Sequence, residues 1–171
     1  MTHIIRKTQR ADISALQDVE RSASQLFKSV PKYEWIAEAE VMRFEDHTVF
    51  VDQGLSWTAE DNTSKMVTGF ILAELHQNDL YIVELSVRQS HQKRGIGSML
   101  LQTVLDEAVR LKAQSITLTT FKHIPWNAPY YSRLGFDIIL SENLPDYLQL
   151  KFENEIAGGF ERDQRCAMRK R

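Results

Sequence analysis

The chain has 171 residues, of which 26% are charged and 43% hydrophobic, and its 21 Lys and Arg residues against 23 Asp and Glu residues give a formal net charge of −2. This length fits one globular domain of about 100–200 residues with a full apolar core, which excludes wholesale disorder. General nucleic-acid binding is also excluded, because it needs a basic surface that neutralises phosphates.

Cys166 is the only cysteine, so an internal disulfide and a cysteine-rich zinc site are excluded. The N-terminal segment lacks a charged region followed by a long apolar run, and no stretch approaches the roughly 18 consecutive apolar residues of a membrane span. The five histidines are scattered without a metal-binding spacing. We therefore expect a cytoplasmic protein that has no metal, no nucleic-acid partner and no membrane contact.

The hydrophobic pattern predicts the elements of the N-terminal half. Apolar residues recur at three- and four-residue spacing over residues 12–27, which predicts a helix after an opening strand at residues 3–8. The other predicted elements are a second helix at 33–42, extended segments at 48–52 and 55–58, a polar connector at 59–64, and strands at 65–75 and 80–87. The turn at 76–79 is so short that the last two strands are expected to be antiparallel neighbours.

The C-terminal half changes to an alternation of strand and helix. A helix is predicted at 95–111 and a strand rich in β-branched residues at 115–121, so strand 80–87 and strand 115–121 are expected to pair in parallel through a right-handed crossover. Asn127 is predicted to cap the next helix, which Gly135 ends. Extended chain at 136–140, a helix at 145–156 and a strand at 166–169 complete the pattern.

The segment between strand 80–87 and helix 95–111 has the properties of an anion site. A loop entering a helix N-terminus presents unpaired N–H groups to a phosphate, and Gly95 and Gly97 allow close approach of the backbone. Lys93 and Arg94 add positive charge. The segment is not a P-loop, which needs Lys after the second glycine, nor a dinucleotide fingerprint, which needs a third glycine at position 100. A plain strand-to-helix turn is the alternative interpretation.

Two motifs together resemble a known family. Gln92-Lys93-Arg94-Gly95-Ile96-Gly97 resembles the Gln/Arg-x-x-Gly-x-Gly/Ala signature of the GNAT superfamily of N-acetyltransferases, and the segment from Asn127 to Phe136 resembles its Asn…Tyr…Gly-Phe block. The resemblance covers about residues 3–140. It implies an α/β (α+β) fold with a mixed, mostly antiparallel twisted sheet, splayed parallel strands 4 and 5, and helices on both faces. We expect one domain over residues 1–171, with a C-terminal helix and strand at 145–171.

The resemblance implies that acetyl-CoA binds where strands 80–87 and 115–121 separate. Backbone amides of residues 92–98 would hold the pyrophosphate, the pantothenyl arm would pair with Leu85 and Val87 like an added strand, and the Leu85 N–H would face the acetyl carbonyl. The residues expected to bind the cofactor are Leu85, Ser86, Val87, Gln92, Lys93, Arg94, Gly95, Ile96, Gly97, Ser98 and Asn127.

Amine acetylation needs a proton acceptor, because an aliphatic amine is largely protonated at neutral pH. Glu84 is a carboxylate in an otherwise apolar strand, and partial burial would make it a better base, directly or through water. Tyr131 stands where the family carries the tyrosine that protonates the departing thiolate; its neighbour Tyr130 points elsewhere on a helix. The alternatives for Glu84 are a position at the solvated end of its strand or a structural ion pair, and the alternative for the two tyrosines is core packing.

These observations favour an N-acetyltransferase that moves the acetyl group of acetyl-CoA to a primary amine of a small molecule in a ternary complex. Two alternatives stay open: a protein or peptide N-acetyltransferase, and a non-catalytic acyl-CoA-binding regulatory module. Acceptor walls are expected from the first two helices, residues 59–64 and the segment after Leu140. Acidic residues such as Glu38, Glu40, Glu45 and Asp46 could attract a cationic amine, and a solvated face explains them equally well. A homodimer through the C-terminal strands is plausible.

Overall fold

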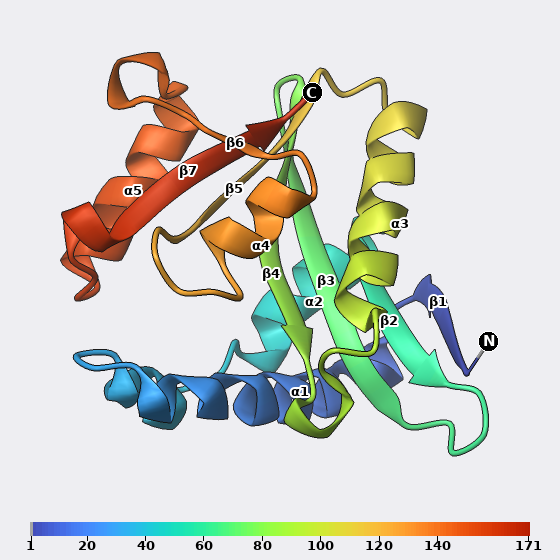
Figure 1. The fold of residues 1–171 in the computed structure, drawn as a ribbon. Helices are drawn as coiled ribbons and strands as arrows, with labels where there is room; N and C mark the ends of the chain where they lie inside the picture. Colours follow the sequence, from blue (N-terminus) through green and yellow to red (C-terminus); the bar gives the residue numbers. More distant parts are fainter. Residues whose placement is uncertain (1) are drawn as a thin grey trace. The chain divides into compact units, whose positions relative to one another are not determined.

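The computed structural model describes residues 2–171, which divide into two compact units. Seven strands are hydrogen-bonded in the order β1-β2-β3-β4-β5-β7-β6 (Figure 1). The first unit contains the residues up to Glu74 together with Ile82–Glu107, and the second contains Leu75–Tyr81 and Ala108–Arg171. The fold is therefore of the mixed α/β class, as expected.

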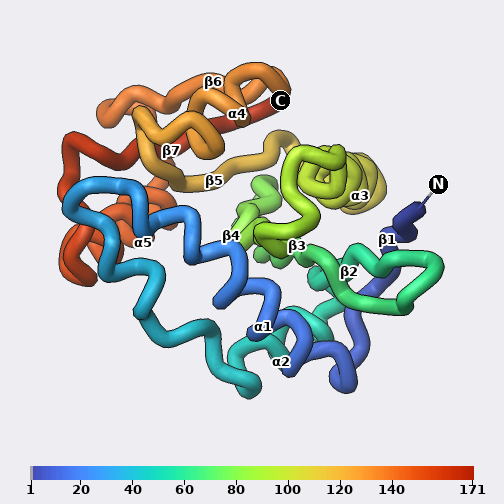
Figure 2. The backbone as a smooth tube through the Cα atoms, turned by 60° about the horizontal axis from the view of Figure 1, so that its bottom comes forward, coloured from blue at the N-terminus to red at the C-terminus, as the bar shows by residue number. Residues whose placement is uncertain are grey.

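The first unit is built on an antiparallel arrangement of β1, β2 and β3. Its elements are β1 (His3–Lys7), α1 (Ile13–Ser24), α2 (Phe44–Asp52), β2 (Ser56–Asp61), most of β3 (Val67–His76), the C-terminal part of β4 (Asp79–Val87) and most of α3 (Ile96–Arg110). β1 pairs with β2 from His3 opposite Asp61 to Lys7 opposite Trp57, and β2 pairs with β3. Within this unit α1 and α2 cover one face of the strands and α3 the other (Figure 2).

The apolar stripe of α1 forms the core of this unit. Leu16 and Val19 are fully buried in one cluster with Phe50 of α2 and with Phe70 and Leu72 of β3. The burial of a side chain of this size stabilises the fold by about 1.5–3 kcal/mol. The spacing that predicts a helix in the sequence is thus the spacing that places these side chains on one face.

Gly69 in β3 sets how closely α3 approaches the sheet. A Cβ atom at this position would lie 3.0 Å from the Ser86 carbonyl oxygen, 3.2 Å from the side chain of Leu100 and 3.3 Å from that of Ile96. Both of those side chains belong to the first turns of α3. The missing side chain therefore lets the N-terminus of α3 sit directly against β3 and the end of β4.

The second unit contains the parallel pair. Asp79, Leu80 and Tyr81 of β4 pair in parallel with Ser115, Ile116 and Thr117 of β5 (Ser115–Phe121). β5 then pairs antiparallel with β7 (Arg165–Lys170), which pairs antiparallel with β6 (Asp137–Ile138). The unit also contains α4 (Ala128–Arg133) and α5 (Asp146–Ala157). The predicted parallel crossover is confirmed, and so are the strand at 115–121 and the C-terminal helix and strand.

The predicted helix at residues 33–42 is wrong in type and extent. Only Glu34–Glu38 is helical, as a short 3-10 helix, and residues 39–43 form an extended segment, here termed the strap. The reason lies in α1: Gln17 Nε2 donates to the Met42 carbonyl at 3.0 Å, and the Glu20 carboxylate accepts from the Met42 N–H. These side chains satisfy backbone groups that a helix would otherwise satisfy.

The predicted extended segment at residues 48–52 is also wrong, because α2 runs through it. Its β-branched residues favour a strand locally, but helical spacing buries His47 and Phe50 on one side, where the His47 ring packs edge-on against Phe70 at 5.6 Å. Tertiary packing therefore overrides local propensity. The predicted connector at 59–64 is partly strand, since Ala59, Glu60 and Asp61 pair with β1.

Candidate active site

Hydrogen bonds hold the loop between β4 and α3 against β3 and against the end of β4. The Arg88 N–H donates to the Thr68 carbonyl at 2.8 Å, and Arg88 Nε donates to the Val67 carbonyl at 2.7 Å. The Gln92 side chain reaches back and donates to the Val87 carbonyl at 3.0 Å. The Gln92 side chain therefore ties the loop back to the end of β4.

The backbone of this loop has the conformation that the glycine signature predicts. Gly95 has a φ of +81°, and a Cβ atom placed there would meet nothing within 4 Å. Lys93 also has a positive φ of 60°, while Gly97 lies inside the first turn of α3. The side chains of Lys93 and Arg94 are exposed, and Ile96 is buried. Open space thus lies over Gly95, next to a helix N-terminus whose first N–H groups lie outside the helical ladder.

The end of β4 carries the strand residues predicted to meet the cofactor arm. In the second unit the parallel register of β4 with β5 ends at Tyr81 opposite Thr117, so the described pairing stops before Leu85. Leu85 and Val87 are half-buried, whereas Ser86 is 6% exposed. The Ser86 hydroxyl donates to Glu84 Oε1 at 2.5 Å. Ser86 therefore orients Glu84 with its side chain.

A second carboxylate that the sequence analysis missed belongs to the same unit. The two carboxylate oxygens of Glu20 on α1 lie 3.3 and 3.1 Å from the Met42 nitrogen. Burial, and then the negative charge of Glu84, raise the pKa of Glu20 to about 7. One signal was available in the sequence, because Glu20 lies four residues after Leu16, within the apolar stripe of its helix.

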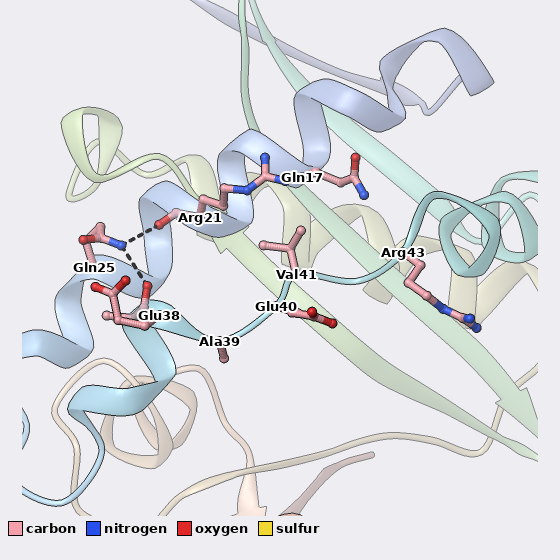
Figure 3. Close-up of a pocket in the computed structure, with 9 residues that line it drawn as sticks. Gln17, Arg21, Gln25, Glu38, Ala39, Glu40, Val41 and Arg43 are labelled. Carbon is pink, nitrogen blue, oxygen red and sulfur yellow. Dashed lines mark hydrogen bonds between the residues drawn. The ribbon is translucent and has the colours of Figure 1, made fainter.

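A groove of about 480 Å³ lies between α1 and the strap in this unit. Gln17 and Arg21 of α1, and Gln25 just after its end, follow one another at four-residue intervals and line one side of the groove, with the strap on the other side (Figure 3). The Gln25 amide donates to the Ala37 carbonyl at 3.1 Å, which holds the 3-10 helix that leads into the strap. Side chains of α1, of the 3-10 helix Glu34–Glu38 and of the strap thus line one groove. This groove is a candidate for the acceptor site.

Asn127 and Tyr131 lie one helical turn apart at the start of α4 in the second unit. The Tyr131 N–H donates to the Asn127 carbonyl at 3.1 Å. Asn127 occupies the predicted cap position but makes no side-chain cap bond, so the predicted capping interaction is wrong. Its Oδ1 atom is buried without a hydrogen-bond partner among residues 2–171. A buried acceptor of this kind is what a donor on a ligand would satisfy.

Tyr131 is the more enclosed of the two neighbouring tyrosines. It is 8% exposed, and its ring packs edge-on against Phe136 at 5.6 Å and against Tyr130 at 5.3 Å. The predicted catalytic residues Glu84 and Tyr131 belong to different units. The position of each residue is therefore described only within its own unit.

The remaining sequence candidates have ordinary surroundings. Cys166 is buried, and burial raises the pKa of its thiol, which keeps it protonated. In the described part of the chain, no three His, Cys, Asp or Glu side chains come together as a metal ion would require. No helix over residues 2–171 is long and apolar enough to span a bilayer.

Comparison with protein families identifies the class. Residues 16–136 match the model of the acetyltransferase (GNAT) family. The match spans α1 to the end of the Asn127–Phe136 block and includes the loop from Gln92 to Ser98. The chain therefore belongs to the GNAT family and is an acyltransferase that depends on coenzyme A.

Solved structures share the fold at low sequence identity. PaiA N-acetyltransferase from Thermoplasma acidophilum, in complex with coenzyme A, is 17% identical with a TM-score of 0.73, and the match covers 100% of this chain and 99% of that one. The ribosomal-protein-S18-alanine N-acetyltransferase from Escherichia coli is 15% identical with a TM-score of 0.66, covering 98% and 92%. N-acetylglutamate synthase from Neisseria gonorrhoeae is 14% identical with a TM-score of 0.75; this chain spans 35% of its length.

The residues present fit the acetyl-CoA that the family uses. The positive φ at Gly95 and the open space over it suit a pyrophosphate held by backbone donors. The exposed Lys93 and Arg94 side chains have the complementary charge. In the second unit, the buried unpaired Oδ1 of Asn127 suits a donor of the pantothenyl arm.

Proposed function

We propose that the protein transfers the acetyl group of acetyl-CoA to a primary amine of a small molecule, by direct attack of the amine in a ternary complex. The observation that carries this proposal is the Glu84 carboxylate, which Ser86 orients on the strand leading into the anion-binding loop. When bound, acetyl-CoA would supply the thioester carbonyl and the thiolate leaving group.

Glu84 acts as the proton acceptor for the amine. An ammonium group has no lone pair, so it must lose a proton before the nitrogen attacks. The Ser86 hydroxyl orients the carboxylate through Oε1, and the carboxylate takes the proton directly or through water. The half-buried position of Glu84 strengthens its interaction with a cation.

Two further groups act on the oxygen and the sulfur of the thioester. The Leu85 N–H donates to the carbonyl oxygen, where negative charge develops, and Asn127 Oδ1 holds the cofactor arm. The Tyr131 hydroxyl gives its proton to the departing thiolate. Burial of Tyr131 keeps this proton from bulk water.

A small cationic acceptor fits the charges of the first unit. The groove between α1 and the strap is lined by Glu38 and Glu40, and the two arginines that also line it, Arg21 and Arg43, form ion pairs with Asp18 and Asp46. Glu38 and Glu40 on the far side of this groove are exposed to solvent. A protein acceptor is the other class to consider, since one solved relative is described by its action on ribosomal protein S18.

A screen of acceptors tests the proposal. Purified protein is incubated with acetyl-CoA and polyamines, amino acids, aminoglycosides or peptides, and the release of free thiol is measured. The expected result is turnover with one of the small amines, lowered by about 10²-fold in Glu84→Gln. Turnover with peptides alone would replace the small-molecule acceptor by a protein one. Coenzyme A binding without turnover on any acceptor would favour a non-catalytic module.

A further inference from the structure

Lys170, the last residue of β7, contacts the C-terminal end of α4 in the second unit. Its Nζ atom donates a hydrogen bond to the Leu134 carbonyl at 2.7 Å. The last carbonyls of a helix have no partner in the helical ladder, and they form the negative end of the helix dipole. The ammonium group of Lys170 therefore satisfies one of these carbonyls and brings a charge of the favourable sign.

Gly135 leaves the space that this contact needs. It has a φ of +88°, and a Cβ atom at this position would lie 2.7 Å from Lys170 Nζ. A side chain at position 135 would therefore displace the ammonium group from the Leu134 carbonyl. The residue after α4 is thus restricted to glycine by its backbone conformation and also by the lysine that reaches over it.

The turn that Lys170 contacts closes directly on Tyr131. The Tyr131 carbonyl accepts hydrogen bonds from the Leu134 N–H at 3.0 Å and from the Phe136 N–H at 3.1 Å. The Phe136 side chain is 1% exposed, and its ring packs edge-on against the Tyr131 ring with 5.6 Å between the centroids. A shift of the Leu134 carbonyl would therefore disturb both the backbone and the ring that border Tyr131.

Strand pairing fixes the backbone on both sides of this contact. Asp137 of β6 pairs with Arg169 of β7 in antiparallel register. These two residues adjoin Phe136 and Lys170 along the chain. Lys170 itself lies opposite Ile116 in the pairing of β5 with β7. The backbone of Lys170 is therefore held in the sheet, and its side chain links that fixed position to α4.

Helix α4 depends on such contacts because it is short. It has six residues, whereas an isolated helix of fewer than about 12–15 residues is marginal in water. Proton transfer needs the donor within hydrogen-bond reach of the acceptor atom. A displacement of about 1 Å can lower a rate by up to about 10²-fold. The groups that hold α4 therefore decide whether a tyrosine on it can act as an acid.

We propose that Lys170 is a positioning residue, whose contact with the Leu134 carbonyl holds the end of α4 so that the Tyr131 hydroxyl keeps the orientation in which it protonates the departing thiolate. This inference rests on the proposed function. In the step, the O–H bond of Tyr131 breaks, its electron pair stays on the oxygen, and the proton forms an S–H bond with the thiolate. The tyrosinate then recovers a proton from solvent. Lys170 transfers no proton in this step.

A double-mutant cycle in kcat tests the inference on the full chain. Lys170→Met removes the ammonium group and keeps most of the length of the side chain. It should lower kcat about 10-fold in the wild-type background and leave kcat unchanged in the Tyr131→Phe background, because the hydroxyl through which Lys170 acts is already gone. The dissociation constant of coenzyme A should stay near the wild-type value. An equal loss of kcat in both backgrounds, or no loss in the wild-type background, would overturn the inference.

Two further variants serve as a rescue and a control. Lys170→Arg keeps the positive charge and a donor, so it should recover most of the kcat that Lys170→Met loses. Arg171→Met removes a charge at the adjacent exposed position and should match the wild type. The melting temperature of each variant checks that the fold is retained. If Arg171→Met lowers kcat as much as Lys170→Met does, the effect comes from the charge of the C-terminal segment and the positioning role is rejected.

NMR of isotope-labelled tyrosine rings gives a readout that needs no substrate. The Tyr131 signal is assigned by its absence in Tyr131→Phe. It should shift in Lys170→Met and keep its position in Arg171→Met, and an unshifted signal in Lys170→Met would overturn the inference. If no acceptor supports turnover, the proposed function fails, and this signal alone decides whether Lys170 positions the ring. If Tyr131→Phe lowers kcat and Lys170→Met does not, the proposed function stands and the positioning role is rejected.

Discussion

The Ser86 hydroxyl donates a hydrogen bond to Glu84 Oε1 at 2.5 Å, from a position two residues further along β4. Residues two apart on a strand lie on the same face, so the bond needs no distortion of the backbone. Ser86 is 6% exposed, which protects the bond from competition by water. The pair thus presents an oriented carboxylate, as a general base requires.

Replacement of Glu84 by Gln should lower kcat by about 10²-fold, because the amide keeps the shape and the contact with Ser86 but accepts no proton. The affinity for coenzyme A should change little. Steady-state kinetics and calorimetric titration of coenzyme A measure the two effects. Glu153→Gln is the control, since Glu153 forms an exposed ion pair with Arg162. Equal kcat in wild type and Glu84→Gln would remove Glu84 from the mechanism.

Tyr131→Phe should lower kcat by about 10–10²-fold while the dissociation constant of coenzyme A stays nearly constant. The substitution removes only the hydroxyl, so the ring contacts with Phe136 and Tyr130 are retained. Tyr130→Phe is the matched control on the adjacent position and should keep wild-type turnover. Tyr131 has a purely structural role if both variants lose stability equally and keep their kcat.

Gly95→Ala should weaken coenzyme A binding, since a φ of +81° is strained for any residue with a Cβ atom. The expected cost in the free energy of unfolding is about 1 kcal/mol, because no atom within 4 Å opposes the new methyl group. Gly54→Ala is the control: Gly54 has a φ of +70° in the same unit but lies outside the loop. Both variants should lose similar stability, and only Gly95→Ala should bind coenzyme A more weakly. Equal affinities would argue against a backbone cradle at Gly95.

The sequence predicts the loop around Gly95 and the two elements on either side of it because their signals are local. The alternation of β4, the helical stripe of α3 and the position of Gly95 are all contained within about 30 consecutive residues, and the parallel pairing with β5 follows from them. Glu84, which the pattern places as a carboxylate in an apolar strand, lies in the same segment. Local periodicity therefore suffices to place these elements, while the roles of the loop and of Glu84 stay predictions.

The strap and Glu20 were missed because their structure depends on contacts distant in sequence. Residues 39–43 have helical propensity in isolation, yet Gln17 and Glu20 bind the Met42 backbone from over 20 residues away. Glu20 itself looks like a solvated residue of an amphipathic helix. Its contact with the Met42 N–H becomes visible only when the strap is seen beside α1.

Asp79→Ala should destabilise the protein by about 3 kcal/mol, because Asp79 accepts hydrogen bonds from three partners in the second unit. Ser115 Oγ lies 2.5 Å away, Tyr147 OH 2.9 Å and Arg169 Nη2 3.2 Å. Tyr147→Phe removes one of these donors and should cost about 1 kcal/mol. Chemical denaturation of the two variants measures the difference. Equal losses would show that the network does not depend on the carboxylate.

The stability of the protein should fall as the pH decreases below about 6.5, in part because of His47. This side chain is 0% exposed, and neither ring nitrogen has a hydrogen-bond partner among residues 2–171. Burial lowers the pKa of His47, although the charge of Asp46 opposes the shift. In the unfolded chain the imidazole takes up a proton near pH 6.5, whereas in the folded chain it stays neutral to a lower pH. Protonation therefore favours the unfolded state over this range.

Replacement of His47 by Leu removes this titration and two buried polar atoms that lack partners. The melting temperature of wild type should decrease between about pH 7.5 and about pH 5.5, and the decrease should be smaller in His47→Leu. At the higher pH the variant should be at least as stable as wild type, since an apolar side chain has no unpaired buried groups. His123→Gln, at an exposed loop position, should retain the full pH dependence. If His47→Leu keeps the wild-type slope, the acid sensitivity arises from other groups.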